Sequence, residues 1–333
     1  MVLDPETALE STTLANYAPT LADNIRNKNG LLWFMRREND KTGGAAGNGE
    51  GRSGLKVVTG GTGFREPLMY GENDTVDSYG PYEDYRTDRQ EGLTHAAFSQ
   101  KVVGGSIVIT DLEKKQNVGE PAILSLMDAK IQQTEITMFN KTDVQLCSDG
   151  TGNASKDIGG IKHLISATPA VGTVGGIDRA LYAWWKNNVN TTGTAAFNTA
   201  LAGKLLMEAM YLACKNGNDT PNLIMTTDAV WSLYSASLDT NLRYSTSDLE
   251  MGKAGFLNVS FHRAIVLSDE NIDAGYMYFI NTDYLFLKVL AGGNFATTPF
   301  ERRGNKFIAL INLYANMTMS NAQRQGLLTA ITG

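Results

Sequence analysis

The longest helical pattern in the chain lies between residues 121 and 147. Mostly apolar positions recur there at spacings of three and four, after a proline suited to a first helical turn. Gly150 and Gly152 follow and would end the helix. The pattern predicts an amphipathic helix from Pro121 to Cys147, about 40 Å long at 1.5 Å per residue. The recurring positions are Leu124, Met127, Ile131, Glu135, Met138, Thr142 and Leu146.

Apolar runs and period-two alternation predict strands on both sides of this helix. In the last of them, alternate residues from Phe307 to Met317 share one face. Two further helices are predicted, at about 194–214 and from Thr227-Asp228 onward. The chain is therefore predicted to be an α+β protein with an antiparallel sheet beside its helices. The predicted strands are 55–59, 96–110, 222–225, 259–267, 276–280, 284–290 and 306–319.

Residues 1–54 have too few apolar positions for a core of their own. Leu14, Tyr17, Leu21 and Ile25 lie on one helical stripe, and six glycines lie between Lys41 and Gly54. We expect an N-terminal arm that lies on another surface, followed by a flexible turn.

The polar stretch between the first two predicted strands carries most of the net charge. From Phe64 to Gly92 there are eight acidic and three basic residues, a net −5, in a protein of formal net charge −6. Aromatic residues alternate with the acids, which a purely solvated loop would not require. We expect this stretch to contact a partner surface; a disordered acidic loop is the alternative. The aromatic residues are Phe64, Tyr70, Tyr79, Tyr82 and Tyr85.

Composition and charge argue against several classes of protein. The 333 residues suffice for more than one packed region. No run of Lys and Arg exceeds two residues, so the sequence lacks the basic cluster expected of a protein that reads nucleic-acid sequence. An acidic start and the lack of about 18 consecutive apolar residues predict a cytosolic protein without a membrane segment. Cys147 and Cys214 are expected to be unpaired.

No motif for catalysis or ligand binding is convincing. Gly49 to Gly54 matches the dinucleotide fingerprint but precedes a strand instead of following one. No Walker A motif or nucleophile elbow occurs, and the three histidines are isolated. The stretch 149–157 lacks the central glycine and closing glutamate of a calcium loop. We predict no catalytic residue, no cofactor and no metal.

The order of these parts resembles the HK97-like major capsid proteins of tailed bacteriophages. The resemblance covers nearly the whole chain and depends on order and spacing. The segments that carry it, besides the helix from Pro121, are Gly63-Phe-Arg-Glu-Pro-Leu-Met-Tyr70, Val103-Gly-Gly-Ser-Ile-Val-Ile-Thr110, Pro221-Asn-Leu-Ile-Met-Thr-Thr-Asp-Ala-Val-Trp231, Tyr276-Met-Tyr-Phe-Ile-Asn-Thr-Asp-Tyr-Leu285 and Asn321-Ala-Gln-Arg-Gln-Gly-Leu-Leu328.

The resemblance implies a structural protein of the virion that is not an enzyme. Subunits would form hexamers and pentamers of an icosahedral shell, assembled in the host bacterial cytoplasm around double-stranded DNA that is enclosed without sequence-specific binding. Scaffolding and portal proteins would be further partners. The implied parts are the N-terminal arm and Gly-rich turn (1–54), the extended E-loop hairpin (55–110), the P-domain with its spine helix (111–150), the A-domain (151–279), the P-domain strands (280–318) and a C-terminal A-domain segment (319–333).

Opposite charges on two extended elements suggest how neighbouring subunits dock. Residues 24–41 have a net charge of +3, against −5 for the acidic stretch, and such complementarity sets register more than affinity. Both elements could also be merely solvated. An encapsulin-like compartment, a soluble enzyme and a bacterial surface protein remain alternatives. The predicted intersubunit residues are Arg26, Lys28, Arg36, Arg37, Lys41, Glu66, Tyr70, Glu72, Asp74, Asp77, Tyr82, Glu83 and Asp84.

Overall fold

The first of two mixed sheets is built around β16 (Lys306–Met319), the longest strand among the described residues of this computed structural model. The structure describes residues 31, 54–117, 126–190, 195–197, 202–238 and 259–332. β16 pairs antiparallel with its neighbours in this sheet, and β1 joins the far side of β13 in parallel. The other strands of the sheet are β1 (Gly54–Val58), β4 (Lys101–Thr110), β13 (Leu285–Leu290), β14 (Ala296–Thr297) and β15 (Glu301–Arg303).

The alternation predicted for β16 is confirmed. Ala309, Ile311, Leu313, Ala315 and Met317 are all buried on one face, while the residues between them are more exposed over the first half of the strand. Over the second half both faces are covered, because the hairpin described below packs on the other side. The strand is therefore one-sided at one end and fully enclosed at the other.

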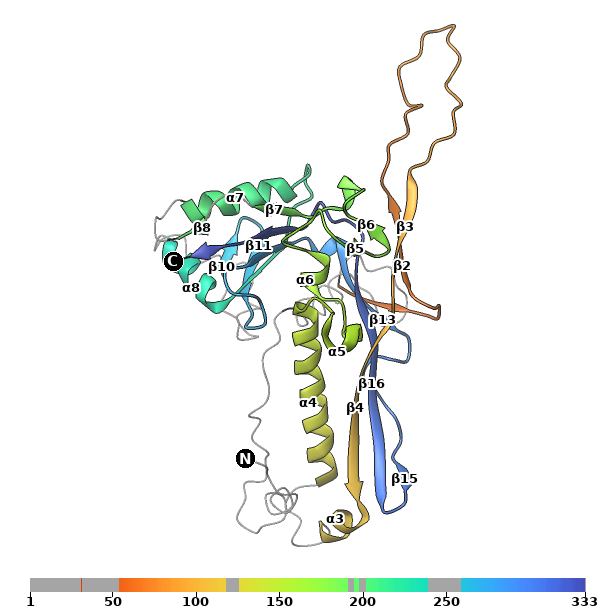
Figure 1. Cartoon of the computed structure of the whole chain (residues 1–333), viewed down its shortest axis with the longest axis vertical. Helices are drawn as coiled ribbons and strands as arrows, with labels where there is room; N and C mark the ends of the chain where they lie inside the picture. Colours follow the sequence, from red (N-terminus) through yellow and green to blue (C-terminus); the bar gives the residue numbers. More distant parts are fainter. Residues whose placement is uncertain are drawn as a thin grey trace.

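Helix α4 (Leu126–Cys147) packs along β4 and is about 33 Å long. Its predicted end at Cys147 is confirmed, and its predicted start at Pro121 lies outside the described residues. Gly105 on β4 permits the close approach, because an added Cβ would lie 2.9 Å from Thr134 Cγ2 on the helix. Figure 1 shows the helix running parallel to the long strands.

The second sheet lies across the end of α4, with strand order β10-β11-β9-β12-β17-β7. Helices α7 (Ala202–Cys214) and α8 (Asp228–Ser237) cover one face, and the core around α4 and α6 covers the other. The sequence predicted an antiparallel sheet, but β9 pairs with β11 in parallel, so this sheet is mixed. The strands are β7 (Asn188–Asn190), β9 (Leu223–Thr226), β10 (Val259–Phe261), β11 (Ala264–Ser268), β12 (Met277–Ile280) and β17 (Gly326–Leu328).

Two element boundaries differ from the sequence prediction. A turn at His262, which has a φ of 52°, splits the predicted strand 259–267 into β10 and β11. Residues 195–196 form β8, which pairs with β18, so the predicted helix cannot begin at residue 194. Thr227 caps α8 as predicted, its side chain accepting from the backbone N–H of Val230.

The remaining elements are short and lie between the two sheets or at the ends of the molecule. Among the described residues, no helix is both long and apolar enough to cross a bilayer. Cys147 and Cys214 are buried and unpaired. These elements are α3 (Asp111–Gln116), α5 (Gly152–Ser155), α6 (Ile161–Leu164), β5 (Thr173–Val174), β6 (Ile177–Asp178), η1 (Ala183–Trp185), β8 (Ala195–Ala196), η3 (Thr282–Tyr284) and β18 (Ile331–Thr332).

A buried hydrogen-bonded junction joins the two sheets where the chain passes from β12 to β13. The Asn281 N–H donates to Gln325 Oε1 at 3.0 Å, and Gln325 Nε2 donates back to the Asn281 carbonyl at 3.0 Å. Asn281 Nδ2 and the Tyr284 hydroxyl both donate to Asp219, at 2.9 and 2.6 Å. Because buried polar groups are costly unless paired, this network fixes the relative placement of the sheets.

Candidate intersubunit surface

A hairpin projects from one end of the molecule, beyond both sheets (Figure 1). β2 (Phe64–Met69) and β3 (Leu93–Phe98) pair antiparallel from Phe64↔Phe98 to Met69↔Leu93, and residues 70–92 form its outer loop. The hairpin is shorter than the predicted 55–110, because β1 and β4 pair with β13 and β16 in the first sheet. The outer loop nevertheless projects away from both sheets (Figure 1).

Glu66 anchors the root of this hairpin inside the subunit. The alternation of β2 places Phe64, Glu66 and Leu68 inward, and Glu66 is only 6% exposed. Its Oε1 lies 2.9 Å from Lys288 Nζ on β13 and accepts from Thr318 Oγ1 on β16 at 2.6 Å. Glu66 was predicted to contact a neighbouring subunit; its burial against Lys288 and Thr318 corrects that prediction.

Two further basic contacts stabilise the same root. Lys288 Nζ also donates to the Arg65 carbonyl at 2.9 Å, so one ammonium group ties β13 to the hairpin backbone and to Glu66. Lys56 lies nearby, with Nζ 3.5 Å from the ring centroid of Phe286. Burial lowers the pKa of Lys56, while the Glu66 carboxylate acts in the opposite direction. The anchor is therefore electrostatic as well as apolar.

A second clamp holds the hairpin from the side of β5 and β6. The Ala97 N–H donates to the Gly175 carbonyl at 2.8 Å. Gly175 has a φ of +60°, and an added Cβ would lie 2.8 Å from Ala96 Cβ, so glycine is needed there for both conformation and space. Tyr70 stacks on Trp184, with ring centroids 5.2 Å apart. Tyr70 thus contacts its own subunit and leaves part of its ring exposed.

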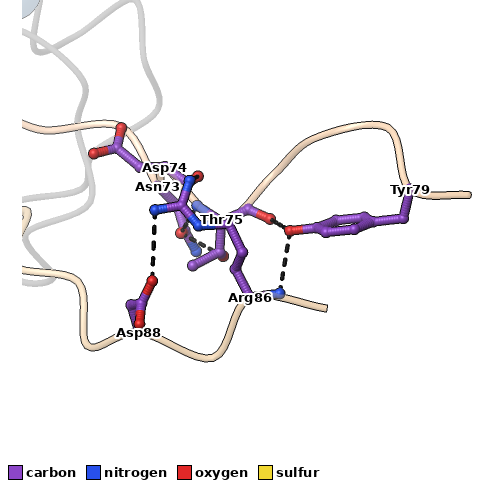
Figure 2. Close-up of polar contacts among 6 residues, drawn as sticks. All are labelled: Asn73, Asp74, Thr75, Tyr79, Arg86 and Asp88. Carbon is purple, nitrogen blue, oxygen red and sulfur yellow. Dashed lines mark hydrogen bonds and ion pairs between the residues drawn. The ribbon is translucent and has the colours of Figure 1, made fainter. Parts of the chain in front are cut away.

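Polar contacts connect the outgoing and returning limbs of the outer loop. Figure 2 shows the Tyr79 hydroxyl donating to the Thr75 carbonyl at 2.6 Å and accepting from the Arg86 N–H at 3.3 Å. Arg86 Nη1 donates to the Asp74 carbonyl at 3.2 Å, and its Nη2 lies 3.5 Å from Asp88 Oδ2. These contacts hold the two limbs of the loop together.

The outer loop presents acids that no cation of the described residues neutralises. Arg86 pairs with Asp88, and Arg89 pairs with Glu91. Five other carboxylates make no ion pair and are exposed: Glu72, Asp74, Asp77, Glu83 and Asp84. Exposed apolar side chains accompany them, which is typical of a contact surface. These are Met69, Val76, Tyr82, Tyr85 and Leu93, with Tyr82 fully exposed.

The predicted basic partners Arg26, Lys28, Arg36, Arg37 and Lys41 lie outside the described residues. The anchor residues Lys288 and Thr318 were not predicted from the sequence. A lysine within the apolar run Leu285–Leu290 is a signal that could have identified Lys288, because a charge in a buried strand requires a partner.

A buried pair of carboxylates lies at the junction of α4 with the second sheet. Asn271 bridges them, its Nδ2 donating to Asp143 Oδ2 and its N–H to Asp269 Oδ1, both at 2.9 Å. Burial and the neighbouring Asp269 raise the pKa of Asp143 to about 7. Among the described residues, no three His, Cys, Asp or Glu side chains are placed to hold a metal ion. The pair therefore links α4 to the second sheet, and the pKa of its Asp143 carboxyl is raised.

Solved structures of shell proteins share this architecture. No protein-family model and no curated protein sequence matches the chain. The capsid protein of cyanophage A-1(L) matches with a TM-score of 0.69 and 15% identity, over 96% of this chain and 98% of that chain. The capsid of a native GTA particle matches with a TM-score of 0.57 and 10% identity, over 96% and 95%.

A compartment protein matches as well. The SrpI encapsulin of Synechococcus elongatus has a TM-score of 0.52 and 10% identity, over 99% of this chain and 96% of that chain. At these identities the comparisons establish the fold. The chain therefore has the mixed α/β capsid fold shared by phage capsid subunits and encapsulins, and the sequence-based prediction of that fold is confirmed.

Proposed function

We propose that the chain is the major capsid protein of a tailed bacteriophage. It would assemble into hexamers and pentamers of an icosahedral shell around packaged double-stranded DNA, with scaffolding and portal proteins as partners. The observation that carries the proposal is the anchored hairpin, whose outer loop projects away from its own subunit. Its exposed apolar and acidic side chains have no partner surface within that subunit, and another copy would supply one.

The parts of the chain then take the roles named for this fold. Residues 1–54 would be the N-terminal arm, and the hairpin within 55–110 would be the E-loop. Helix α4 and the strands β13 to β16 of the first sheet would form the P-domain from residues 111–150 and 280–318, with β1 and β4 of that sheet flanking the hairpin. The second sheet would form the A-domain from residues 151–279 and 319–333. The buried junction at Asn281 and Gln325 supports this division, because the chain passes between the two sheets there.

Docking between the acidic loop and the basic segment 24–41 remains part of the proposal. Reversing Arg36 and Arg37 to Glu should leave the monomer soluble but prevent shell closure, since like charges would then face each other. Sedimentation and electron microscopy of the variant would measure this. Particles of normal yield and size would refute that contact.

An encapsulin-like compartment is the second candidate, supported by the match over 99% of the chain to the SrpI encapsulin. The two candidates predict different contents. A phage shell should hold DNA, whereas a compartment should hold cargo protein, so nuclease-protected nucleic acid in purified particles separates them.

Expression of the full chain, with and without a phage scaffolding protein, tests the proposal as a whole. Negative-stain images should show closed shells, and the chain should enclose DNA without preference for its sequence. A monodisperse monomer with hydrolytic activity would contradict a structural role.

A further inference from the structure

A cavity of about 230 Å³ lies between α4 and the first sheet. Its floor is buried on β13 and β16, where Leu287, Val289 and Leu313 are each at most 1% exposed. Its rim is the connection from β13 to β14, residues 291–295. We call this space the α4 cavity, and its apolar lining is Leu55, Phe139, Leu287, Val289, Phe295 and Leu313.

The rim of the α4 cavity is held in an unusual backbone conformation. The Tyr314 N–H donates to the Gly293 carbonyl at 2.9 Å, and an added Cβ on Gly293 would lie 2.5 Å from Tyr314 Cδ2. Two residues further along, Phe295 has a φ of +48°, a conformation that costs free energy for a bulky side chain. The Phe295 ring lies against Phe139 of α4, with ring centroids 4.5 Å apart. The strained rim therefore gives the cavity a second aromatic wall.

The polar groups of the α4 cavity differ in what they can offer a ligand. Thr142 is fully buried, and its hydroxyl donates to the Met138 carbonyl at 2.8 Å, so its proton is already used. Asn294 is exposed, and its side chain forms no hydrogen bond with any residue that the structure describes. Its amide can both donate to and accept from a molecule in the cavity. An apolar floor with a polar group at the rim is typical of small-molecule sites.

The size and walls of the α4 cavity favour an aromatic ligand. Empty apolar space forfeits the dispersion contacts of the atoms around it, and an apolar cavity of about 150 Å³ can stay dry and bind benzene. The α4 cavity is larger, at about 230 Å³, and has room for two fused rings. The rings of Phe139 and Phe295 would make offset or edge-on contacts with a third ring. A planar molecule with one hydrogen-bonding group matches both the walls and Asn294.

We propose that the α4 cavity binds a small aromatic molecule of one or two fused rings that carries one hydrogen-bonding group. The rings would lie on Leu287, Val289 and Leu313, and the polar group would bond to the Asn294 amide. This inference does not depend on the proposed shell function, because the cavity belongs to a single subunit. A bound molecule would contact both α4 and the first sheet, so it should stabilise the folded subunit.

Titration calorimetry of the full chain with indole tests the site, and indene, which has the same shape without the N–H, is the matched ligand. Indole should bind with a dissociation constant on the order of 0.1 mM. Asn294→Ala should weaken indole binding about threefold to tenfold and leave indene binding unchanged, because indene makes no hydrogen bond. No binding of either compound to the wild-type chain, or equal effects of Asn294→Ala on both, would overturn the inference.

Filling the cavity is a second test. Leu55→Trp enlarges a partly exposed residue of the lining and should lower the affinity for indole at least tenfold. Val57→Trp, on the same strand but outside the lining, is the matched control and should bind indole as the wild-type chain does. Indole bound equally by both variants would lie elsewhere, and the assignment would be wrong.

Stability gives an independent measure of the same binding. Indole at about ten times its dissociation constant should raise the urea midpoint of the wild-type chain and of Val57→Trp, but not that of Leu55→Trp. Circular dichroism would confirm that each variant folds. Asn294 is exposed, so its comparison of indole with indene decides the matter even where Leu55→Trp does not fold. An equal rise in all three chains would contradict binding in the α4 cavity.

Discussion

Replacing Asp143 by asparagine should stabilise the subunit at pH 8 and leave its stability at pH 4 nearly unchanged. Asp143 is 3% exposed, and its Oδ1 has no hydrogen-bond partner. Asp269 and Glu270 from the β11–β12 connection both disfavour its ionisation, whereas the Asn271 hydrogen bond favours it. Asparagine has the same shape and carries no charge, so it mimics the protonated carboxyl.

The stability changes with pH because the folded and unfolded chains bind protons differently at Asp143. Below pH 4 the carboxyl is protonated in both the folded and the unfolded chain, so its raised pKa has no effect on stability. Between pH 4 and 7 the folded chain retains a proton that the unfolded chain has released, and stability therefore falls as pH rises. A pKa raised from 3.8 to about 7 corresponds to a loss of about 4 kcal/mol that is complete above pH 7. Asp143→Asn should recover about 2–4 kcal/mol there.

Urea unfolding followed by tryptophan fluorescence at several pH values would measure this difference. Asp149→Asn is a suitable control, because hydrogen bonds from Thr151 lower the pKa of Asp149 and so favour the folded state at neutral pH. Its substitution should lower stability at pH 7 and have little effect at pH 2. Equal effects of Asp143→Asn at pH 4 and pH 8 would refute the reasoning.

Three further substitutions test other contacts. Lys288→Met leaves the Glu66 carboxylate buried and unpaired, which should cost about 3–5 kcal/mol in urea unfolding, and Glu66→Gln added to it should recover part of that loss; a cost under 1 kcal/mol would contradict the anchor. Gly105→Val should lower the free energy of unfolding by about 1–3 kcal/mol, because the valine side chain would clash with Thr134 on α4. Gly71→Ala is the control and should lower it less, because the added methyl group would make only ordinary contacts. Equal losses from the two substitutions would refute the close approach of α4 to β4. Arg86→Ala removes the contacts between the loop limbs, so amide exchange of residues 70–92 should accelerate while the unfolding midpoint stays the same; unchanged exchange would show that those contacts are not formed.

Much of the fold could be predicted because its signals are local. The helical period fixes the end of α4 at Cys147, and alternation fixes the buried face of β16. The parallel pairing of β1 with β13 has no such signal, since Leu55 and its partner Leu287 are more than 200 residues apart. The burial of Glu66 could have been predicted, because Glu66 lies on the same face of its strand as the apolar residues Phe64 and Leu68.

The charged surfaces were only half predictable. The acidic loop is contiguous in sequence, so its net charge of −5 identifies it directly. The contact of Lys114 with Phe307, in contrast, depends on the register of β4 with β16. The Asp143 and Asp269 pair likewise depends on how α4 meets the second sheet. Neither arrangement leaves a trace in local spacing.

The most direct test of the shell proposal is to shorten the hairpin. In a variant with residues 72–90 replaced by a short Gly-Ser turn, the anchors at Glu66 and Gly175 are retained, so the subunit should fold as before. Circular dichroism would confirm the fold, and electron microscopy of the wild-type and shortened chains would then be compared. We predict closed shells from the wild-type chain and only soluble subunits or open assemblies from the variant. Closed shells of equal yield from the shortened chain would contradict it.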